Sequence, residues 1–167
     1  MTKKILITYG TAAGSTAEVA QAVAEEMEQG DVQVDVQPVE TVKDISGYDA
    51  VVVGTAVRVF KIIKKTRRFL NKHRKALSKV PVAYFLLCLT MEKETPENIR
   101  QAKEYAKPML AIKEPVSLGL FGGVIDHDRL TDLIGKSMKY IPEQDHRDWD
   151  KIRAWARETL PKLVAYQ

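Results

Sequence analysis

The stretch that decides the fold is KILITYGTAAGSTAEVAQAV, residues 4–23. Its apolar run over 5–9 predicts a buried strand, small and hydroxyl residues over 10–16 predict a loop, and an amphipathic helix is expected over 17–28. Ser15 and Glu18 have the spacing of a capping box at the start of that helix. A helix N-terminus offers backbone N–H groups and a positive dipole end, which bind phosphate. The segment is therefore interpreted as a phosphate-binding loop, with an ordinary well-capped turn as the alternative.

The rest of the chain alternates apolar runs with helical patterns, which is typical of a parallel α/β sheet. Strands are expected over 4–9, 32–39, 50–54, 80–88 and 116–124. Helices are expected over 17–28, 61–78, 96–111 and 148–164. Thr95 and Asp148 are predicted to cap the last two helices, and Pro108 is predicted to kink or end the third. Right-handed crossovers then predict a doubly wound five-stranded sheet with order 2-1-3-4-5 and helices on both faces.

The length predicts one domain over 1–167, with an extra segment at about 126–148 that a minimal five-stranded fold does not need. Apolar residues recur in that segment at helical spacing. It is interpreted as a short helix packed on the domain, or as a flap beside the ligand.

The composition excludes several classes of protein. Hydrophobic residues make up 45% and charged residues 29% of the 167, as in a soluble globular domain. No apolar run approaches the roughly 18 residues of a membrane span, and no signal peptide precedes the first strand, so a cytoplasmic protein is expected. The single cysteine, Cys88, excludes an internal disulfide, and cysteine and histidine are too few and scattered for a metal site.

The net charge of +4 is unevenly distributed. Residues 60–79 contain nine basic and no acidic residues, so the remainder of the chain is net negative. The basic stretch is interpreted either as a solvated helix face or as a docking face. The docking partner would be an acidic redox protein or the anionic inner face of a membrane. Nucleic acid is not expected, because no recognised motif or aromatic platform accompanies the charge.

Residues 9–16, YGTAAGST, resemble the FMN-phosphate loop of flavodoxins, whose pattern is Thr/Ser-x-Thr-Gly-x-Thr. Thr11, Gly14 and Thr16 match this pattern, whereas Ala13 replaces the middle threonine. The segments 48–58, 118–126 and 148–155 extend the resemblance over nearly the whole chain. Residues 48–58 resemble the third strand and the flavin loop that follows it, and residues 118–126 and 148–155 resemble the branch of the flavodoxin-domain family that includes menaquinone-dependent protoporphyrinogen oxidase. The resemblance implies a flavodoxin-like fold and FMN as cofactor.

The resemblance also implies which residues bind the flavin. The phosphate loop would comprise Thr11, Ala12, Ala13, Gly14, Ser15 and Thr16. The two loops around the isoalloxazine ring would comprise Thr55, Ala56, Val57 and Arg58, and Cys88, Leu89, Thr90 and Met91, with Gly122 and Gly123 nearby. Flavodoxins usually stack Trp and Tyr on the ring, and neither loop contains one. Arg58 would stabilise a reduced anionic flavin by Coulomb attraction, or would instead pair with a surface carboxylate.

Three functions follow as hypotheses. The first is electron transfer through FMN between partners such as a redox protein or a quinone. The second is an enzyme, either a menaquinone-linked protoporphyrinogen oxidase or a small quinone reductase, although no nicotinamide fingerprint is present. The third is a non-redox phosphate-binding or signalling domain, but the acidic cluster of receiver domains is missing after the first and third strands. No catalytic residue is assigned, because no histidine has a Ser or Cys nucleophile in register.

Overall fold

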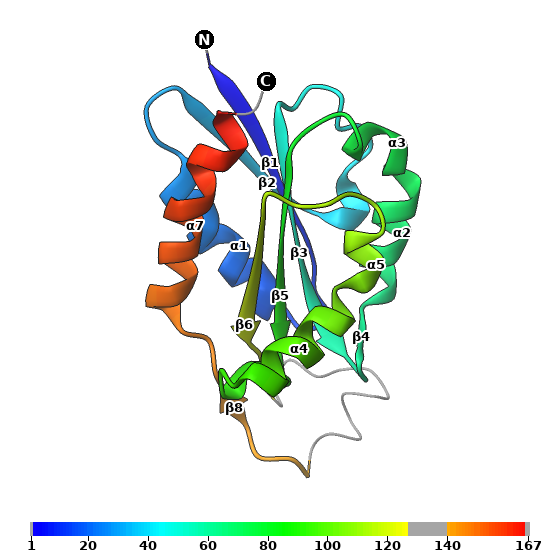
Figure 1. Ribbon diagram of the computed structural model, residues 1–167, viewed down its shortest axis with the longest axis vertical. Helices are drawn as coiled ribbons and strands as arrows, with labels where there is room; N and C mark the ends of the chain where they lie inside the picture. Colours follow the sequence, from blue (N-terminus) through cyan, green and yellow to red (C-terminus); the bar gives the residue numbers. More distant parts are fainter. Residues whose placement is uncertain (1, 127–139, 166–167) are drawn as a thin grey trace.

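The computed structural model describes residues 2–126 and 140–165, and its centre is a five-stranded parallel sheet (Figure 1). The strands are β1 (Lys3–Gly10), β2 (Val32–Pro38), β3 (Ala50–Arg58), β5 (Val82–Cys88) and β6 (Ser117–Gly122). They lie in the order β2-β1-β3-β5-β6, so the predicted order 2-1-3-4-5 is confirmed. The order reverses between β1 and β3, and an open α/β sheet forms its ligand crevice at such a point.

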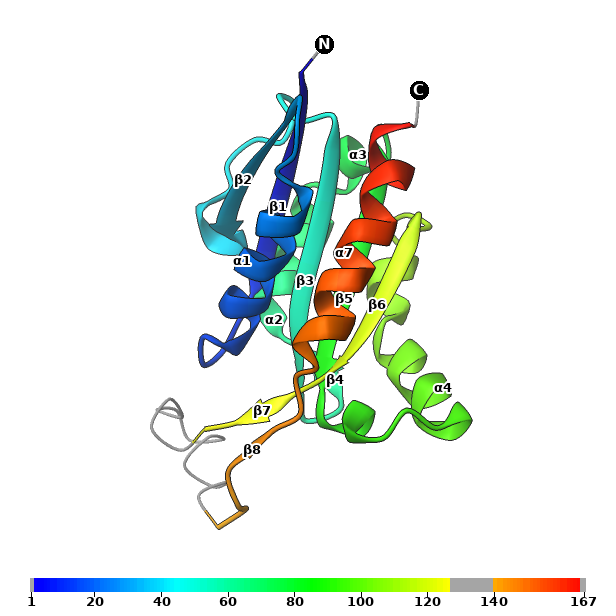
Figure 2. The ribbon, with the colours of Figure 1, turned by 90° about the vertical axis from the view of Figure 1, so that its left-hand side faces the viewer.

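Helices cover both faces of the sheet (Figures 1 and 2). On one face lie α1 (Ser15–Met27) and α7 (Trp149–Val164). On the other lie α2 (Lys64–Lys72), α3 (Arg74–Leu77), α4 (Pro96–Tyr105) and α5 (Lys107–Leu110), with short 3-10 turns η1 (Val39–Thr41) and η2 (Leu89–Glu92). Successive side chains of a strand point to opposite faces, so each strand supplies both layers of the core. Phe85, for example, packs under α1 and α7, whereas its neighbour Leu86 packs under the other helices.

The predicted helix ends are confirmed for the third and fourth helical segments. Thr95 Oγ1 accepts a hydrogen bond of 3.1 Å from the N–H of Asn98, and Asp148 Oδ1 accepts one of 3.1 Å from the N–H of Lys151. The third segment divides into α4 and α5 just before Pro108, which has no N–H to donate into a continuous helix.

Two local predictions are wrong. Ser15 does not cap α1 but is its first residue. The N-cap is Gly14, in the left-handed region at φ 94°, which has no side chain with which to cap the helix. The helix predicted over 61–78 begins later and is interrupted. Residues Lys61–Ile62 form β4, which pairs antiparallel with the end of β3, and His73 separates α2 from α3. The extra strand pair was missed because its turn, Val59–Phe60, adopts positive φ with residues that rarely do so.

After Gly123 the chain leaves the sheet. Strand β7 (Val124–Ile125) pairs antiparallel with β8 (Gln144–Asp145), and this ribbon extends below the body of the domain (Figure 2). The helix expected within 126–148 falls mostly on 127–139, outside the described residues. Within 2–126 and 140–165, no helix is long and apolar enough to span a bilayer, and no cluster of three potential metal ligands occurs.

Candidate functional site

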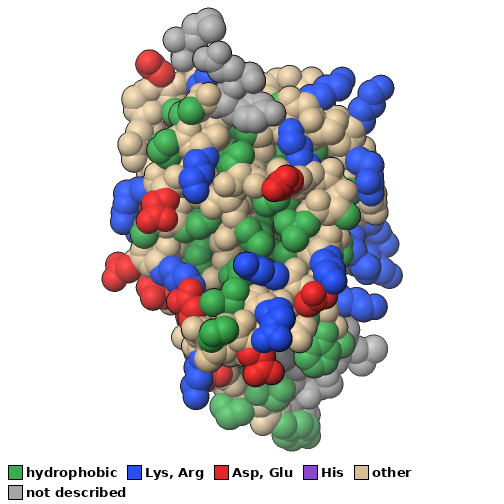
Figure 3. All heavy atoms as spheres, viewed as in Figure 1, with side chains coloured by type: hydrophobic (Ala, Val, Ile, Leu, Met, Phe, Trp, Pro, Cys, Tyr) green, Lys and Arg blue, Asp and Glu red, His purple; other side chains and the backbone are tan. Residues whose placement is uncertain are grey.

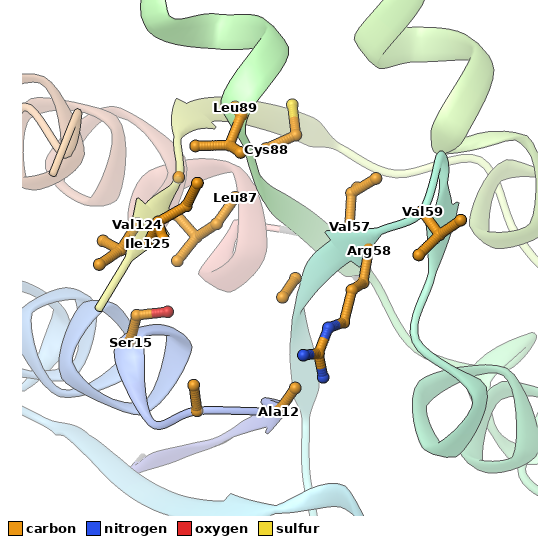
Figure 4. Close-up of a pocket in the computed structure, with 13 residues that line it drawn as sticks. Ala12, Ser15, Val57, Arg58, Val59, Leu87, Cys88, Leu89, Val124 and Ile125 are labelled. Atoms are coloured by element: carbon orange, nitrogen blue, oxygen red, sulfur yellow. The ribbon is translucent and has the colours of Figure 1, made fainter. Parts of the chain in front are cut away.

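A pocket opens at the carboxyl ends of the central strands, where the strand order reverses (Figure 4). It draws residues from the loop after β1, the end of β3, the end of β5 and strand β7. The residues that line it are Ala12, Ala13, Ser15, Ala56, Val57, Arg58, Val59, Leu87, Cys88, Leu89, Gly123, Val124 and Ile125. Nine of them belong to the predicted site, and the structure brings together the four separate segments from which they come.

The loop after β1 and the first residue of α1 border this pocket. The N–H of Gly14 donates to Thr11 Oγ1 at 2.8 Å, so the Thr11 hydroxyl closes the loop from within. Among the described residues the N-cap of α1, Gly14, provides no side-chain hydrogen bond, and the first N–H groups of a helix lack intrahelical partners. Thr16 is fully buried, and within the described residues its Oγ1 has no hydrogen-bond partner. A buried hydroxyl without a hydrogen-bond partner destabilises the folded protein, unless a bound ligand supplies that partner. The loop therefore fits an anion.

The end of β3 forms one wall, but not as the predicted loop. The strand continues to Arg58, and only Ala56, Val57 and Arg58 of the four predicted residues line the pocket. Thr55 is buried, with its Oγ1 2.9 Å from that of Thr66 on α2, so its hydroxyl serves helix packing. The Arg58 side chain extends from β3 toward Ala12 in the first loop (Figure 4). A cation therefore lies on the wall of the pocket.

The end of β5 forms the opposite wall. Of the four predicted residues, Cys88 and Leu89 line the pocket, whereas Thr90 and Met91 do not. Met91 is buried in the core on the α4 side, and Thr90 Oγ1 lies 3.5 Å from the Tyr105 hydroxyl of α4. The 3-10 turn η2 begins at Leu89 and carries both residues away from the crevice.

The pair Gly122–Gly123 seats the β7–β8 ribbon. A Cβ on Gly122 would overlap the backbone of His146, and one on Gly123 would lie 3.1 Å from the carbonyl carbon of Cys88. The Gly123 N–H donates to the Cys88 carbonyl, and its carbonyl accepts from the His146 N–H, both at 3.0 Å. The missing side chains thus admit a neighbouring segment. Gly123 lines the pocket and Gly122 does not.

Sequence reasoning missed four lining residues: Val59, Leu87, Val124 and Ile125. Leu87 directly precedes the predicted residue Cys88, and the alternation of side chains along the strand would have been enough to predict it. Val124 and Ile125 are an apolar pair directly after two glycines, a signal that the chain turns back beside the site. All four are aliphatic, and among the thirteen lining residues there is no aromatic ring. Phe60, the nearest aromatic in the sequence, is 77% exposed and packs near Tyr105 instead.

Arg147 was also missed, and it fastens the start of α1. Its side chain is 8% exposed, with Nη2 2.8 Å from Asp145 Oδ2 and Nη1 3.3 Å from the carbonyl of Ser15. The guanidinium also lies 3.5 Å from Glu18 Oε2 and over the Trp149 ring. Hydrogen bonding to Asp145 raises the pKa of Arg147, and the same bond lowers the pKa of Asp145. The β8 segment is thereby held against the start of α1 by a permanently charged group.

Cys88 lines the pocket but is not built as a nucleophile. Burial raises the pKa of its thiol to about 11, and in Figure 4 the sulfur points away from Ser15 and Ala12. The thiolate is the reactive form, so at pH 8 only about one thiol in a thousand is reactive. Iodoacetamide should therefore label the native protein far more slowly than the urea-unfolded chain, and the rate should rise toward pH 11. Mass spectrometry of timed samples measures this; complete labelling within minutes at pH 7–8 would contradict it.

Comparisons with known proteins agree with this geometry. Residues 6–150 match the model of the flavodoxin domain family. The chain is 26% identical over 173 aligned residues to protoporphyrinogen IX dehydrogenase (quinone) of Escherichia coli K12, covering 93% of each chain. Among solved structures it resembles an archaeal flavodoxin (TM-score 0.60, 18% identity, 96% and 99% covered) and an oxidoreductase from Corynebacterium diphtheriae (TM-score 0.63, 14% identity, 99% of both covered). The family match spans most of the chain and every residue that lines the pocket: this protein belongs to the flavodoxin domain family.

Proposed function

We propose that the protein binds FMN in the pocket between β1 and β3 and acts as a redox protein. The observation that carries this proposal is the buried hydroxyl of Thr16, which has no hydrogen-bond partner among the described residues and lies in the first turn of a helix whose N-cap residue, Gly14, has no side chain. Both features fit a phosphate monoester, and the flavodoxin domain family implies a flavin. The aliphatic walls beside the loop fit the apolar part of that cofactor.

The residues divide the work between the two ends of FMN. The backbone of Ala12, Ala13 and Ser15 and the Thr16 hydroxyl would hold the phosphate. Val57, Leu89 and their aliphatic neighbours would contact the ring and keep water from it. Bound FMN would supply one- and two-electron chemistry, while the protein sets its orientation and electrostatic environment.

A flavin titration tests the proposal. The purified protein should be yellow or should become so with added FMN, and it should bind FMN more tightly than riboflavin, which lacks the phosphate. Fluorescence quenching of each flavin gives both dissociation constants. A colourless protein that binds neither flavin would contradict the proposal. Equal affinities for FMN and riboflavin would show that the loop after β1 does not bind the phosphate.

One observation favours a more specific function. The E. coli relative, named a protoporphyrinogen IX dehydrogenase (quinone), aligns over 93% of both chains. We therefore propose oxidation of an organic donor with a quinone as acceptor, the donor losing two electrons and two protons for each quinone reduced to quinol. Anaerobic mixing with protoporphyrinogen IX and menadione tests this through the appearance of porphyrin fluorescence. If the protein reduces menadione with other reductants but not with protoporphyrinogen IX, the result would instead favour a simple quinone reductase or an electron-transfer protein.

Arg58 gives a prediction about redox behaviour. A cation near the flavin stabilises the more negatively charged redox state, which is the reduced one. Replacing Arg58 by Ala should therefore make the midpoint potential more negative, with an upper bound of about 3 kcal/mol for one charge at roughly 6 Å and an effective dielectric of about 20. Dye-equilibrated reductive titration measures the potential, and Arg58→Lys, which keeps the charge, is the control.

The Arg58→Ala variant also tests whether the Arg58 charge acts on the flavin ring or on the phosphate. Because the side chain extends toward Ala12 in the first loop, it also lies on the phosphate side of the pocket. An Arg58→Ala protein with an unchanged potential and a weaker preference for FMN over riboflavin would assign Arg58 to the phosphate. That result would overturn the redox role.

A further inference from the structure

A second hollow adjoins the pocket on the side of α2. It shares Ala12, Arg58 and Val59 with the pocket, so the end of β3 forms a wall common to both. Its other wall is the β4 strand and the first turns of α2. We call it the basic groove, because its polar side chains are cationic. Lysine and arginine side chains gather on this side of the molecule, over α2 and α3 (Figure 3).

Several of the cationic side chains of the basic groove are not neutralised by an ion pair within the part of the chain that the structure describes. Lys64 lies three and four residues before Arg67 and Arg68, so the three side chains share one side of α2. Within residues 2–126 and 140–165, these three side chains form no ion pair, and Lys61 forms none either. Lys65, in contrast, pairs with Glu40 at 3.0 Å. The N-terminal end of the α2 dipole adds to the positive potential. This arrangement favours an anionic ligand.

The lining also has an apolar component. Val59, Ile62 and Ile63 contribute to the groove between the cations, and Val59 is 61% exposed at the tip of the β3–β4 hairpin. A concave surface with aliphatic and cationic side chains fits a small molecule with an apolar body and carboxylate groups. An acidic protein would present a broad convex face, for which a hollow offers less contact.

We propose that the basic groove is a binding site for an organic polycarboxylate with an apolar body, held by Lys64, Arg67 and Arg68. This proposal rests on the proposed function, which places a flavin in the adjoining pocket. A ligand in the basic groove would reach that pocket across Arg58 and Val59. The groove would then select donors by their carboxylates, while the flavin pocket supplies the redox chemistry.

Porphyrin binding tests the proposal independently of turnover. The probes are protoporphyrin IX, with two carboxylates, and its dimethyl ester, with the same ring and none. The protein as purified should bind the diacid at least about tenfold more tightly than the ester, as measured by porphyrin fluorescence anisotropy. Binding should weaken as salt rises from 50 to 300 mM, because exposed charges are screened.

The variant Arg67→Glu/Arg68→Glu should weaken diacid binding about tenfold or more and leave ester binding unchanged. The matched control is Lys75→Glu/Lys79→Glu, which reverses two exposed charges of the same basic stretch beyond the groove. This control should bind the diacid as the wild type does. FMN affinity should be the same in all three proteins, so loss of FMN binding would signal failure of the proposed function or of folding rather than of the groove.

Two outcomes would overturn the proposal. Equal loss of diacid binding in both double variants would show general charge attraction rather than a site. No diacid binding by the wild type, together with sedimentation on phosphatidylcholine–phosphatidylglycerol vesicles that Arg67→Glu/Arg68→Glu abolishes, would make this face a lipid-binding surface instead.

Discussion

Replacing Thr16 by Val should weaken FMN binding roughly ten- to hundredfold without destabilising the protein. The hydroxyl is buried and unpartnered among the described residues, so the folded chain gains nothing from it. A hydrogen bond to a charged phosphate contributes about 1.5–3 kcal/mol, which corresponds to this change in affinity. Valine keeps the shape and the β-branch of threonine. Isothermal titration with FMN measures the loss, and thermal unfolding of the flavin-free protein should show an unchanged or slightly higher midpoint.

Thr159→Val is the matched control. Thr159 is also fully buried with an unpartnered Oγ1, but it lies on α7 in the half of the helix remote from the loop. Its removal should leave FMN affinity unchanged. Riboflavin supplies a second control, because Thr16→Val should not alter its binding if the hydroxyl serves the phosphate. Unchanged FMN affinity in Thr16→Val would show that the phosphate is held elsewhere, and a loss shared by riboflavin would indicate a distorted loop.

The sequence predicted the sheet well because buried parallel strands have a strong signature. Strands β1, β3 and β5 are near-continuous apolar runs, and helices with one apolar face separate them. The crossover rule then fixes the order. The helix caps at Thr95 and Asp148 were predictable for a similar reason, since each depends on a local side-chain hydrogen bond within three residues.

The site was predicted less completely because its details depend on contacts distant in sequence. Thr55 points to Thr66 rather than into the pocket, and Met91 turns into the core, so neither position could be judged from its own segment. Arg147 reaches Ser15 across 132 positions of the chain. The β3–β4 hairpin was not predicted for a different reason. Its turn has positive φ at Val59 and Phe60, whereas Gly or Asn at these positions would have indicated such a turn.

Truncating Phe85 to Ala should destabilise the protein by about 3–5 kcal/mol, the usual range for a buried phenylalanine. Phe85 is fully buried in β5, with its ring centroid 6.2 Å from that of Phe121 and 5.9 Å from that of Trp155. These three rings join β5, β6 and α7 just below the pocket. For a chain of this size the loss corresponds to a fall of roughly 6–20 °C in the unfolding midpoint. Calorimetry of the flavin-free protein measures it.

A second substitution tests the packing that explains this loss. A Cβ on Gly54 would overlap the Phe85 ring, so Gly54→Ala alone should cost about 1–3 kcal/mol through overpacking. In the Phe85→Ala background the ring is gone and the added methyl group occupies part of the cavity. The double variant should therefore be more stable than the sum of the single losses predicts, which a double-mutant cycle measures directly. Strict additivity would show that the two residues do not share this space. Gly54 and Phe85 are register partners just before the pocket-lining ends of β3 and β5, so a favourable coupling would place this packing contact between the two strands that carry opposite walls of the pocket.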